Sequence, residues 1–157
     1  MEFSEQTKAE FTKLLTHYPR KDAALLPALY LAQREFGYVS LEAMEYVASL
    51  VGVSPARVYG VATFYTMYNQ EPVGRNLVQV CMNLPCAMRG AEEVLEYIEK
   101  KLGIKAGETS QDNKFTLMKV ECLGACGNAP MMQIDDDYYE DLTPSKVDTV
   151  LARLRAE

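Results

Sequence analysis

Four cysteines in two close pairs are the feature that most constrains this chain of 157 residues. The first eighty residues contain no cysteine, and then the pattern is Cys81-x4-Cys86, thirty-five residues, and Cys122-x3-Cys126. Each pair follows a short segment of high β-propensity. If the two strands are neighbours in one sheet, both loops leave at the same end of it. The fold then has to bring two sulfur-bearing loops together around one centre.

The pattern favours an iron–sulfur cluster. Four thiolates around a 2Fe–2S core leave a negative charge, and reduction adds another, so nearby N–H donors are stabilising. Gly124 and Gly127 permit tight turns in the second loop and allow backbone N–H groups to approach sulfur. A helix beginning after Cys86 is expected to direct its positive N-terminus at the same charge. The expected ligands are Cys81, Cys86, Cys122 and Cys126.

Other uses of four cysteines fit less well. Structural zinc is the main alternative, because its C-x₂₋₄-C ligand pairs are not excluded by these spacings. A disulfide scaffold is disfavoured, since a chain of this length can build a core without cross-links. A thiol oxidoreductase would need a C-x-x-C pair, which is absent. His17 is the only histidine, so Rieske ligation by two histidines is excluded and all-thiolate ligation favours a low potential.

Composition and charge exclude other classes. With 48% hydrophobic and 24% charged residues, the chain reads as a soluble globular protein. A net charge of −6 and the absence of basic blocks argue against nucleic acid and against an anionic membrane. No apolar run approaches the ~20 residues of a spanning helix, and residues 1–15 do not resemble a signal peptide. We therefore expect a cytoplasmic protein that meets a membrane only through partners.

Residues 1–72 are predicted to form a small helical bundle that docks to a partner. Asp22, Ser40 and Ser54 are expected to cap the second, third and fourth helices, and Gly37 is expected to end the second. The first helix shows apolar residues at helical spacing. These are Phe11, Leu14, Leu15 and Tyr18.

Residues 73–157 are predicted to form an α/β domain resembling a reduced thioredoxin fold, which makes the whole chain α+β. The order is β-α-β-β-α, with helices over 91–102 and from Pro144 onward. The inward positions expected in the last helix are Val147, Val150, Leu151 and Leu154. The predicted strands are 76–82, 115–121, 131–134 and 138–142.

Three further groups are interpreted as structural. An aromatic group is expected in the core of the bundle, and the alternative is that it faces a partner. The group consists of Tyr59, Phe64, Tyr65 and Tyr68. Four methionines near the cysteine loops are expected to pack there and keep water out; they are Met82, Met88, Met131 and Met132. The acidic stretch 135–137 is expected to be a solvated hairpin turn.

Several stretches resemble one family along nearly the whole chain. They are the two spaced pairs, ECLGACGNAP (121–130), and GVATFYTMYN (60–69) followed by EPVGR. The chain is similar to the thioredoxin-like 2Fe–2S subunit of NADH:quinone oxidoreductase, respiratory complex I. One departure is CMNLPC (81–86), where a smaller or more polar residue is expected near Asn83 and Leu84. It should affect solvent access and potential but not ligation.

The resemblance implies one 2Fe–2S cluster on Cys81, Cys86, Cys122 and Cys126, and docking against a flavin-bearing NADH-oxidising subunit that holds FMN and NADH. A larger multi-cluster iron–sulfur subunit is a further expected partner, in the peripheral arm on the cytoplasmic face of the inner membrane. No residue is expected to be catalytic, because the chain has no nucleotide motif and a 2Fe–2S cluster cannot accept a hydride. Alternatives are the equivalent subunit of an NAD-linked hydrogenase or formate dehydrogenase, a free-standing ferredoxin, and a zinc-stabilised interaction module.

Overall fold

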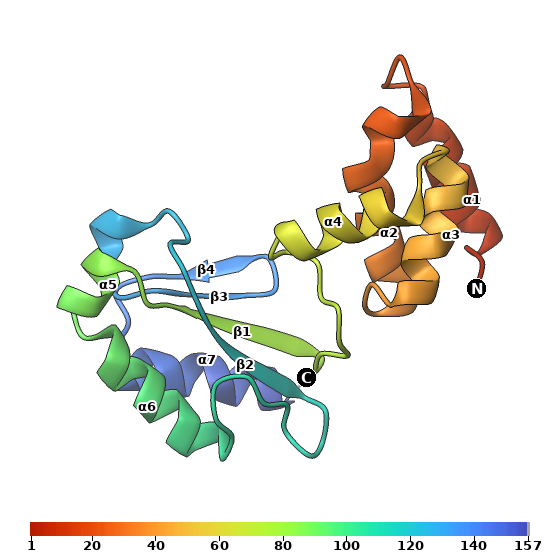
Figure 1. Ribbon diagram of the computed structural model, residues 1–157. Helices are drawn as coiled ribbons and strands as arrows, with labels where there is room; N and C mark the ends of the chain where they lie inside the picture. The colour runs from red at the N-terminus through yellow and green to blue at the C-terminus, as the bar shows by residue number, and fades with distance from the viewer. Residues whose placement is uncertain (157) are drawn as a thin grey trace. The chain divides into compact units, whose positions relative to one another are not determined.

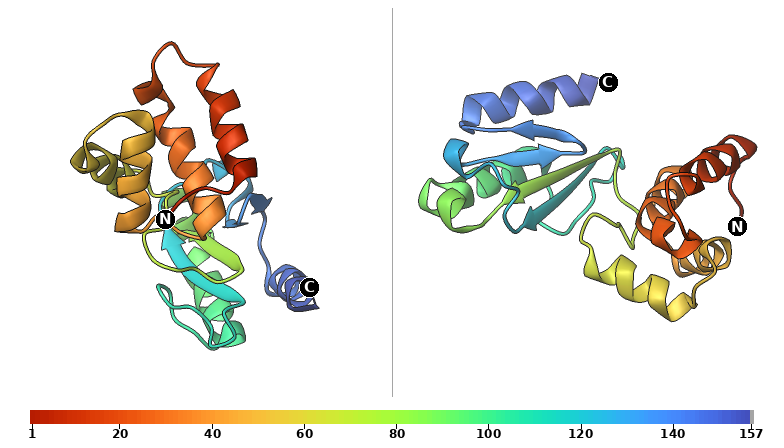
Figure 2. Two further views of the ribbon diagram at one scale, coloured as in Figure 1. Left: turned by 90° about the vertical axis from the view of Figure 1, so that its right-hand side faces the viewer. Right: turned by 90° about the horizontal axis from the view of Figure 1, so that it is seen from above.

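The chain forms two compact units, Met1–Pro72 and Val73–Glu157. The structure is a computed structural model and describes residues 1–156. Figure 1 and Figure 2 show helices alone in the first unit, and a sheet with helices in the second. Each unit has a hydrophobic core built from its own residues.

The first unit begins its helices largely where capping residues predict. The Ser40 and Ser54 side chains accept hydrogen bonds from the backbone N–H groups of Ala43 and Arg57, which confirms both predicted caps. Gly37 ends the second helix in the left-handed conformation, also as predicted. The helices are α1 (Glu5–Leu15), the 3₁₀ turn η1 (Lys21–Ala24), α2 (Leu25–Phe36), α3 (Leu41–Val51) and α4 (Pro55–Phe64).

Two predictions about the start of this unit were wrong. Asp22 caps no helix: it lies in η1, and its carboxylate accepts a hydrogen bond of 2.9 Å from Nε of Arg20. The local ion pair occupies the carboxylate, and α2 begins three residues later. Tyr18 lies beyond the end of α1, which extends only to Leu15.

The aromatic group of this unit does not form its core. Tyr68 alone is buried, and its hydroxyl donates to the Leu26 carbonyl at 2.8 Å. The side chains of Tyr59, Phe64 and Tyr65 are exposed, Phe64 by 75%. Helix α4 buries only Val58 and Ala62, four residues apart, and packs the partly buried Val61 beside them, so its aromatic residues lie outside the core. The larger buried residues of the core are Phe3, Phe11, Leu25, Leu29, Val39, Met44, Val47, Val51, Val58 and Tyr68.

Crossing a membrane as a helix requires a segment that is both long and apolar. No single helix among the described residues is both long and apolar enough. Helices α3 and α4 satisfy the requirement only when taken together, and they are bent by 119° at the break between them.

The second unit contains a four-stranded sheet in the order β2-β1-β3-β4. Strands β1 and β2 are parallel, while β3 is antiparallel to both β1 and β4. The predicted α+β class and all four predicted strands are confirmed. The order is β-α-β-β-β-α, one strand more than the predicted β-α-β-β-α, and one short helix, α5, is added. The elements are β1 (Asn76–Cys81), α5 (Leu84–Met88), α6 (Ala91–Leu102), β2 (Phe115–Val120), η2 (Cys126–Asn128), β3 (Met132–Ile134), β4 (Asp137–Tyr139) and α7 (Pro144–Ala156).

Helices α6 and α7 cover the same face of this sheet (Figure 1). Asp148 of α7 connects them, since its carboxylate accepts from the Tyr97 hydroxyl at 2.8 Å and lies 2.9 Å from Lys101 Nζ. The four inward positions predicted for the last helix are all buried. The core includes Val78, Val80, Val94, Leu95, Ile98, Phe115, Leu117, Met132, Ile134, Leu142, Val147, Val150, Leu151 and Leu154.

The acidic stretch 135–137 is exposed and lies at the hairpin turn between β3 and β4, as predicted. Oδ1 of Asp135 accepts the Leu77 N–H at 3.0 Å, which ties the turn to the beginning of β1. Burial raises the pKa of the Asp135 carboxyl, partly offset by this hydrogen bond. The turn therefore belongs to the sheet.

The register between β1 and β2 determines where the cysteine loops begin. Asn76 lies opposite Phe115, and Cys81 lies opposite Val120 at the other end. Gly74 precedes β1 where only a glycine fits, because an added Cβ would lie 2.8 Å from the backbone carbon of Phe115. Its N–H donates to Thr116 Oγ1 at 2.6 Å. Both strands end one residue earlier than predicted. Cys81 is therefore the last residue of β1, and Cys122 lies two residues after the end of β2.

Candidate metal centre

The four cysteines gather at the carboxyl ends of β1 and β2. Cys81 is the last residue of β1, and Cys86 lies within α5. Cys122 follows β2 by two residues, and Cys126 begins η2. Because the two strands are parallel neighbours, their loops leave the sheet at the same end, where α5 and η2 lie side by side (Figures 1 and 2). The predicted meeting of the two loops is thus observed.

The sulfurs form an inner and an outer pair. Cys81 and Cys86 are each only 2% exposed, whereas Cys122 and Cys126 are exposed. The Sγ atoms of the outer pair are 3.6 Å apart. A tetrahedral metal with metal–sulfur bonds of ~2.3 Å separates two ligand sulfurs by about 3.8 Å. All four residues are free thiols, and among residues 1–156 no three His, Cys, Asp or Glu side chains surround a single metal position.

Electrostatics link the two pairs. Burial, and then a hydrogen bond with Cys81, raise the pKa of the Cys86 thiol to about 11, although the Met131 N–H acts in the opposite direction. The hydrogen bond and the charge of Cys122 raise the pKa of Cys126. The charges of Cys81 and Cys126 also act across the gap between the pairs. Four thiolates this close repel one another, so deprotonating all of them requires a cation among them.

Backbone geometry at the second loop partly matches expectation. Gly124 has φ +89° and its N–H points at Cys122 Sγ, 3.4 Å away, as predicted for a sulfur-directed donor. Gly127 does not have a positive φ, since it lies in the 3₁₀ turn η2. The helix expected after Cys86 is α6, which covers the predicted residues 91–102. Cys86 lies inside the short α5, and the longer α6 begins at Ala91, whose methyl packs with the inner cysteines.

Contacts between the loops hold the two pairs together. Asn83, between the inner cysteines, donates through Nδ2 to Oε2 of Glu121 at 3.0 Å. The Met82 N–H donates to the Val120 carbonyl at 2.9 Å, continuing the sheet ladder beyond β1. Sequence reasoning did not identify Asn83 or Glu121 as partners. Their only signal is that both are polar and adjacent to the cysteine motifs.

The methionine prediction was right in part. Met131 is fully buried and packs with Cys81 and Cys86, together with Ala91 and Ala129. It forms the apolar wall expected behind the inner pair. Met88 is instead 78% exposed, and Leu84 at the start of α5 is 68% exposed. The five-residue helix α5 buries Cys86 and partly buries Pro85, and it leaves Leu84, Ala87 and Met88 exposed.

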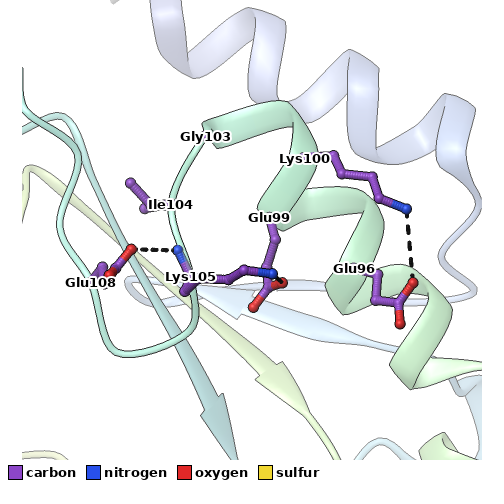
Figure 3. A pocket seen from close by; sticks show the side chains of 7 residues that line it. All are labelled: Glu96, Glu99, Lys100, Gly103, Ile104, Lys105 and Glu108. Carbon is purple, nitrogen blue, oxygen red and sulfur yellow. Dashed lines mark hydrogen bonds and ion pairs between the residues drawn. The ribbon is translucent and has the colours of Figure 1, made fainter.

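A hollow of about 480 Å³ lies away from the cysteines, at the C-terminal end of α6 (Figure 3). Lys105 Nζ is 2.6 Å from Oε2 of Glu99, and its backbone N–H donates to Glu108. Lys100 pairs with Glu96 along the helix. These charged groups neutralise one another, and α6 spans ~18 Å between this hollow and the cysteines.

Comparison with known proteins places the chain in a family. The family model described as thioredoxin-like [2Fe-2S] ferredoxin matches residues 11–155, which is almost the whole chain. The chain belongs to the thioredoxin-like [2Fe-2S] ferredoxin family. The family's cofactor, one 2Fe–2S cluster, fits the donor set. The outer pair has the spacing of two thiolates on one iron, and the inner pair is close enough for a hydrogen bond between its thiols.

Relatives of this ferredoxin-family chain carry consistent names. It is 47% identical to NADH dehydrogenase [ubiquinone] flavoprotein 2, mitochondrial, of Dictyostelium discoideum, over 98% of this chain and 64% of that protein. It is 49% identical to a subunit of the NADH-quinone oxidoreductase of Rickettsia bellii, over 90% of this chain and 87% of that protein. The chain therefore spans less than two thirds of the first relative.

A solved structure shares the fold. The crystal structure of an NAD+-reducing [NiFe]-hydrogenase in the air-oxidized state matches 85% of this chain and 23% of that chain. The TM-score is 0.74 and the sequence identity is 19%. At this identity the likeness concerns the fold alone.

Proposed function

We propose that this chain holds one 2Fe–2S cluster on Cys81, Cys86, Cys122 and Cys126 and serves as an electron-transfer subunit of NADH:quinone oxidoreductase. The observation that carries the proposal is the meeting of two thiol pairs at one end of the parallel strands β1 and β2. When bound, such a cluster takes up and releases one electron at a time. The chain contributes ligation, a dry inner wall and N–H donors, and it bears no complete active site.

The identity with named relatives supports the choice of parent enzyme. Relatives at 47–49% identity are named as NADH dehydrogenase or NADH-quinone oxidoreductase subunits. The partner would be a flavin-bearing subunit that oxidises NADH and holds FMN, because the flavin can divide an electron pair into single electrons. A larger multi-cluster iron–sulfur subunit would adjoin it in the peripheral arm, on the cytoplasmic face of the inner membrane. The exposed outer pair, Cys122 and Cys126, leaves one edge of the site open to such a partner.

Metal analysis of protein purified without oxygen tests the ligand set. We expect about two irons and two acid-labile sulfides per chain, with a brown colour that zinc would not give. Cys122→Ser and Cys126→Ser should each remove or strongly alter the electron paramagnetic resonance signal of the reduced protein. Met131→Leu is the matched control, since it removes a sulfur that contacts the inner pair and should leave the signal intact. An unaltered signal in either serine variant would exclude that ligand.

Purification from the native host tests the parent enzyme. An affinity-tagged copy of the full chain should bring with it a flavoprotein that contains FMN and is reduced by NADH. A chain that purifies alone would support the free-standing ferredoxin instead. Nickel in the purified complex would support an NAD-linked hydrogenase. Molybdenum or tungsten with formate oxidation would support a formate dehydrogenase.

A further inference from the structure

Two hydrogen bonds meet on a single peptide unit between the outer cysteines. The Tyr138 hydroxyl, from β4, donates to the carbonyl oxygen of Leu123 at 2.6 Å. The N–H on the other side of the same peptide belongs to Gly124, and it donates to Cys122 Sγ at 3.4 Å. Among residues 1–156 the only cis peptide is Ala129–Pro130, so this peptide is trans and its carbonyl and N–H point in opposite directions.

The planar peptide couples the two bonds. Because the C=O and N–H groups share one plane, a phenol that holds the oxygen also determines the direction of the N–H. A hydrogen bond accepted by the carbonyl polarises the amide, and the N–H then becomes a stronger donor. The positive φ of Gly124 leaves this peptide without a side chain that would hold it by packing.

The surroundings of Tyr138 indicate that its hydroxyl, and not the packing of its ring, orients the Leu123–Gly124 peptide. Its side chain is 50% exposed, so packing contributes little to its position. The same segment holds the far end of the loop: Glu140 accepts from Nδ2 of Asn128 at 2.8 Å, and the Asp141 N–H donates to the Asn128 carbonyl at 2.7 Å. Residues 138–141 thus support the second cysteine loop from outside, and Tyr138 is the one that bonds between the two cysteines.

We propose that Tyr138 is a positioning residue that raises the reduction potential of the cluster by directing the Gly124 N–H at the Cys122 sulfur. The inference rests on the proposed function, in which Cys122 is a ligand. Reduction adds negative charge to the cluster and its thiolates, so a donor to sulfur stabilises the reduced state more than the oxidised state. Removing the phenol hydroxyl loosens the peptide and weakens that donor.

A redox titration of the full chain with its cluster, followed by electron paramagnetic resonance, tests the proposal. In Tyr138→Phe the equilibrium constant for reduction should fall by about threefold to tenfold, the factor associated with losing one hydrogen bond. Tenfold corresponds to ~59 mV for a one-electron couple. Tyr139→Phe is the matched control, because the Tyr139 hydroxyl accepts from Arg153 and does not contact the loop. Its potential should equal that of the unmodified chain.

A second substitution reverses the sign of the effect. Site-specific 3-fluorotyrosine at position 138 has a more acidic hydroxyl, which donates a stronger hydrogen bond and should raise the potential. Resonance Raman spectra in H₂O and D₂O give an independent readout, since the deuterium shift of the iron–thiolate stretch should shrink in Tyr138→Phe. Unchanged potentials in both variants, or an equal change in Tyr139→Phe, would overturn the proposal. An unaltered cluster signal in Cys122→Ser would instead overturn the ligand assignment on which the proposal rests.

Discussion

At the residue scale, Tyr68 is a titratable group held inside the helical unit. Burial raises the pKa of its hydroxyl above the ordinary value of 10.0, because the phenolate would be desolvated beside the Leu26 carbonyl. The folded state therefore holds this proton more tightly than the unfolded state does. The stabilisation it gives is complete below the unfolded pKa of about 10 and is lost as the pH rises above it.

Comparing the unmodified chain with Tyr68→Phe isolates this group. At neutral pH the variant should lose about 1 kcal/mol of unfolding free energy with the hydrogen bond to Leu26. Between pH 9 and 11 the difference in unfolding free energy between the two proteins should shrink, by at most ~1.4 kcal/mol per pH unit. The reason is that Tyr68 ionises in the unfolded state of the unmodified chain, which lowers its stability, whereas the phenylalanine of the variant has no proton to lose. Urea denaturation followed by circular dichroism at several pH values measures it. A difference that does not change with pH would contradict the assignment.

Residues near the site differ in how far they could be predicted. The four cysteines were identifiable because thiol chemistry and spacing are both visible in sequence. The pairing of Asn83 with Glu121, and of Tyr138 with Leu123, joins residues 38 and 15 positions apart. Such pairs depend on strand order and register, which local propensity does not specify. The burial predicted for Phe64 was wrong for a similar reason, since an aromatic residue is buried only when its face of the helix turns inward.

At the scale of elements, the N-cap of α4 makes a contribution to stability that can be measured. Ser54→Ala removes the acceptor for the Arg57 N–H and should lower the unfolding free energy of the helical unit by about 0.5–2 kcal/mol. Ser49→Ala is the control: its hydroxyl bonds the Tyr46 carbonyl within α3 and caps nothing, so the change should lie within ~0.5 kcal/mol. Thermal denaturation compares the two. Equal losses would show that capping is not the cause.

The ends of helices were predicted best where no neighbouring side chain competes with the capping interaction. Ser40, Ser54 and Gly37 mark real ends, because N-caps and left-handed C-caps depend on local backbone geometry. Asp22 was misread, because the neighbouring Arg20 competes for its carboxylate. Helix α5 was missed altogether, since five residues containing a cysteine and a proline carry no periodic signal.

At the scale of the whole molecule, two separate cores predict two separable responses. Leu29 and Ile98 are fully buried, one in each core. Leu29→Ala should cost about 2–5 kcal/mol in the helical unit and leave the thermal loss of visible cluster absorbance unchanged. Ile98→Ala should cost a similar amount and lower the temperature at which that absorbance is lost. If Leu29→Ala shifts the absorbance transition equally, the two units unfold as one.

If the four cysteines hold the cluster as proposed, the pairing of Cys81 with Val120 gives the cofactor a role in selecting the native sheet. A slip of β2 by two residues would keep its apolar face inward, yet it would carry the second thiol pair ~6.6 Å away from the first. A chain with the slipped register could not place all four thiols around two irons. The cluster would therefore bind, and stabilise, only chains with the native register. Cluster binding would thereby stabilise the native register of β2 over the slipped register, which the hydrophobic pattern alone does not distinguish.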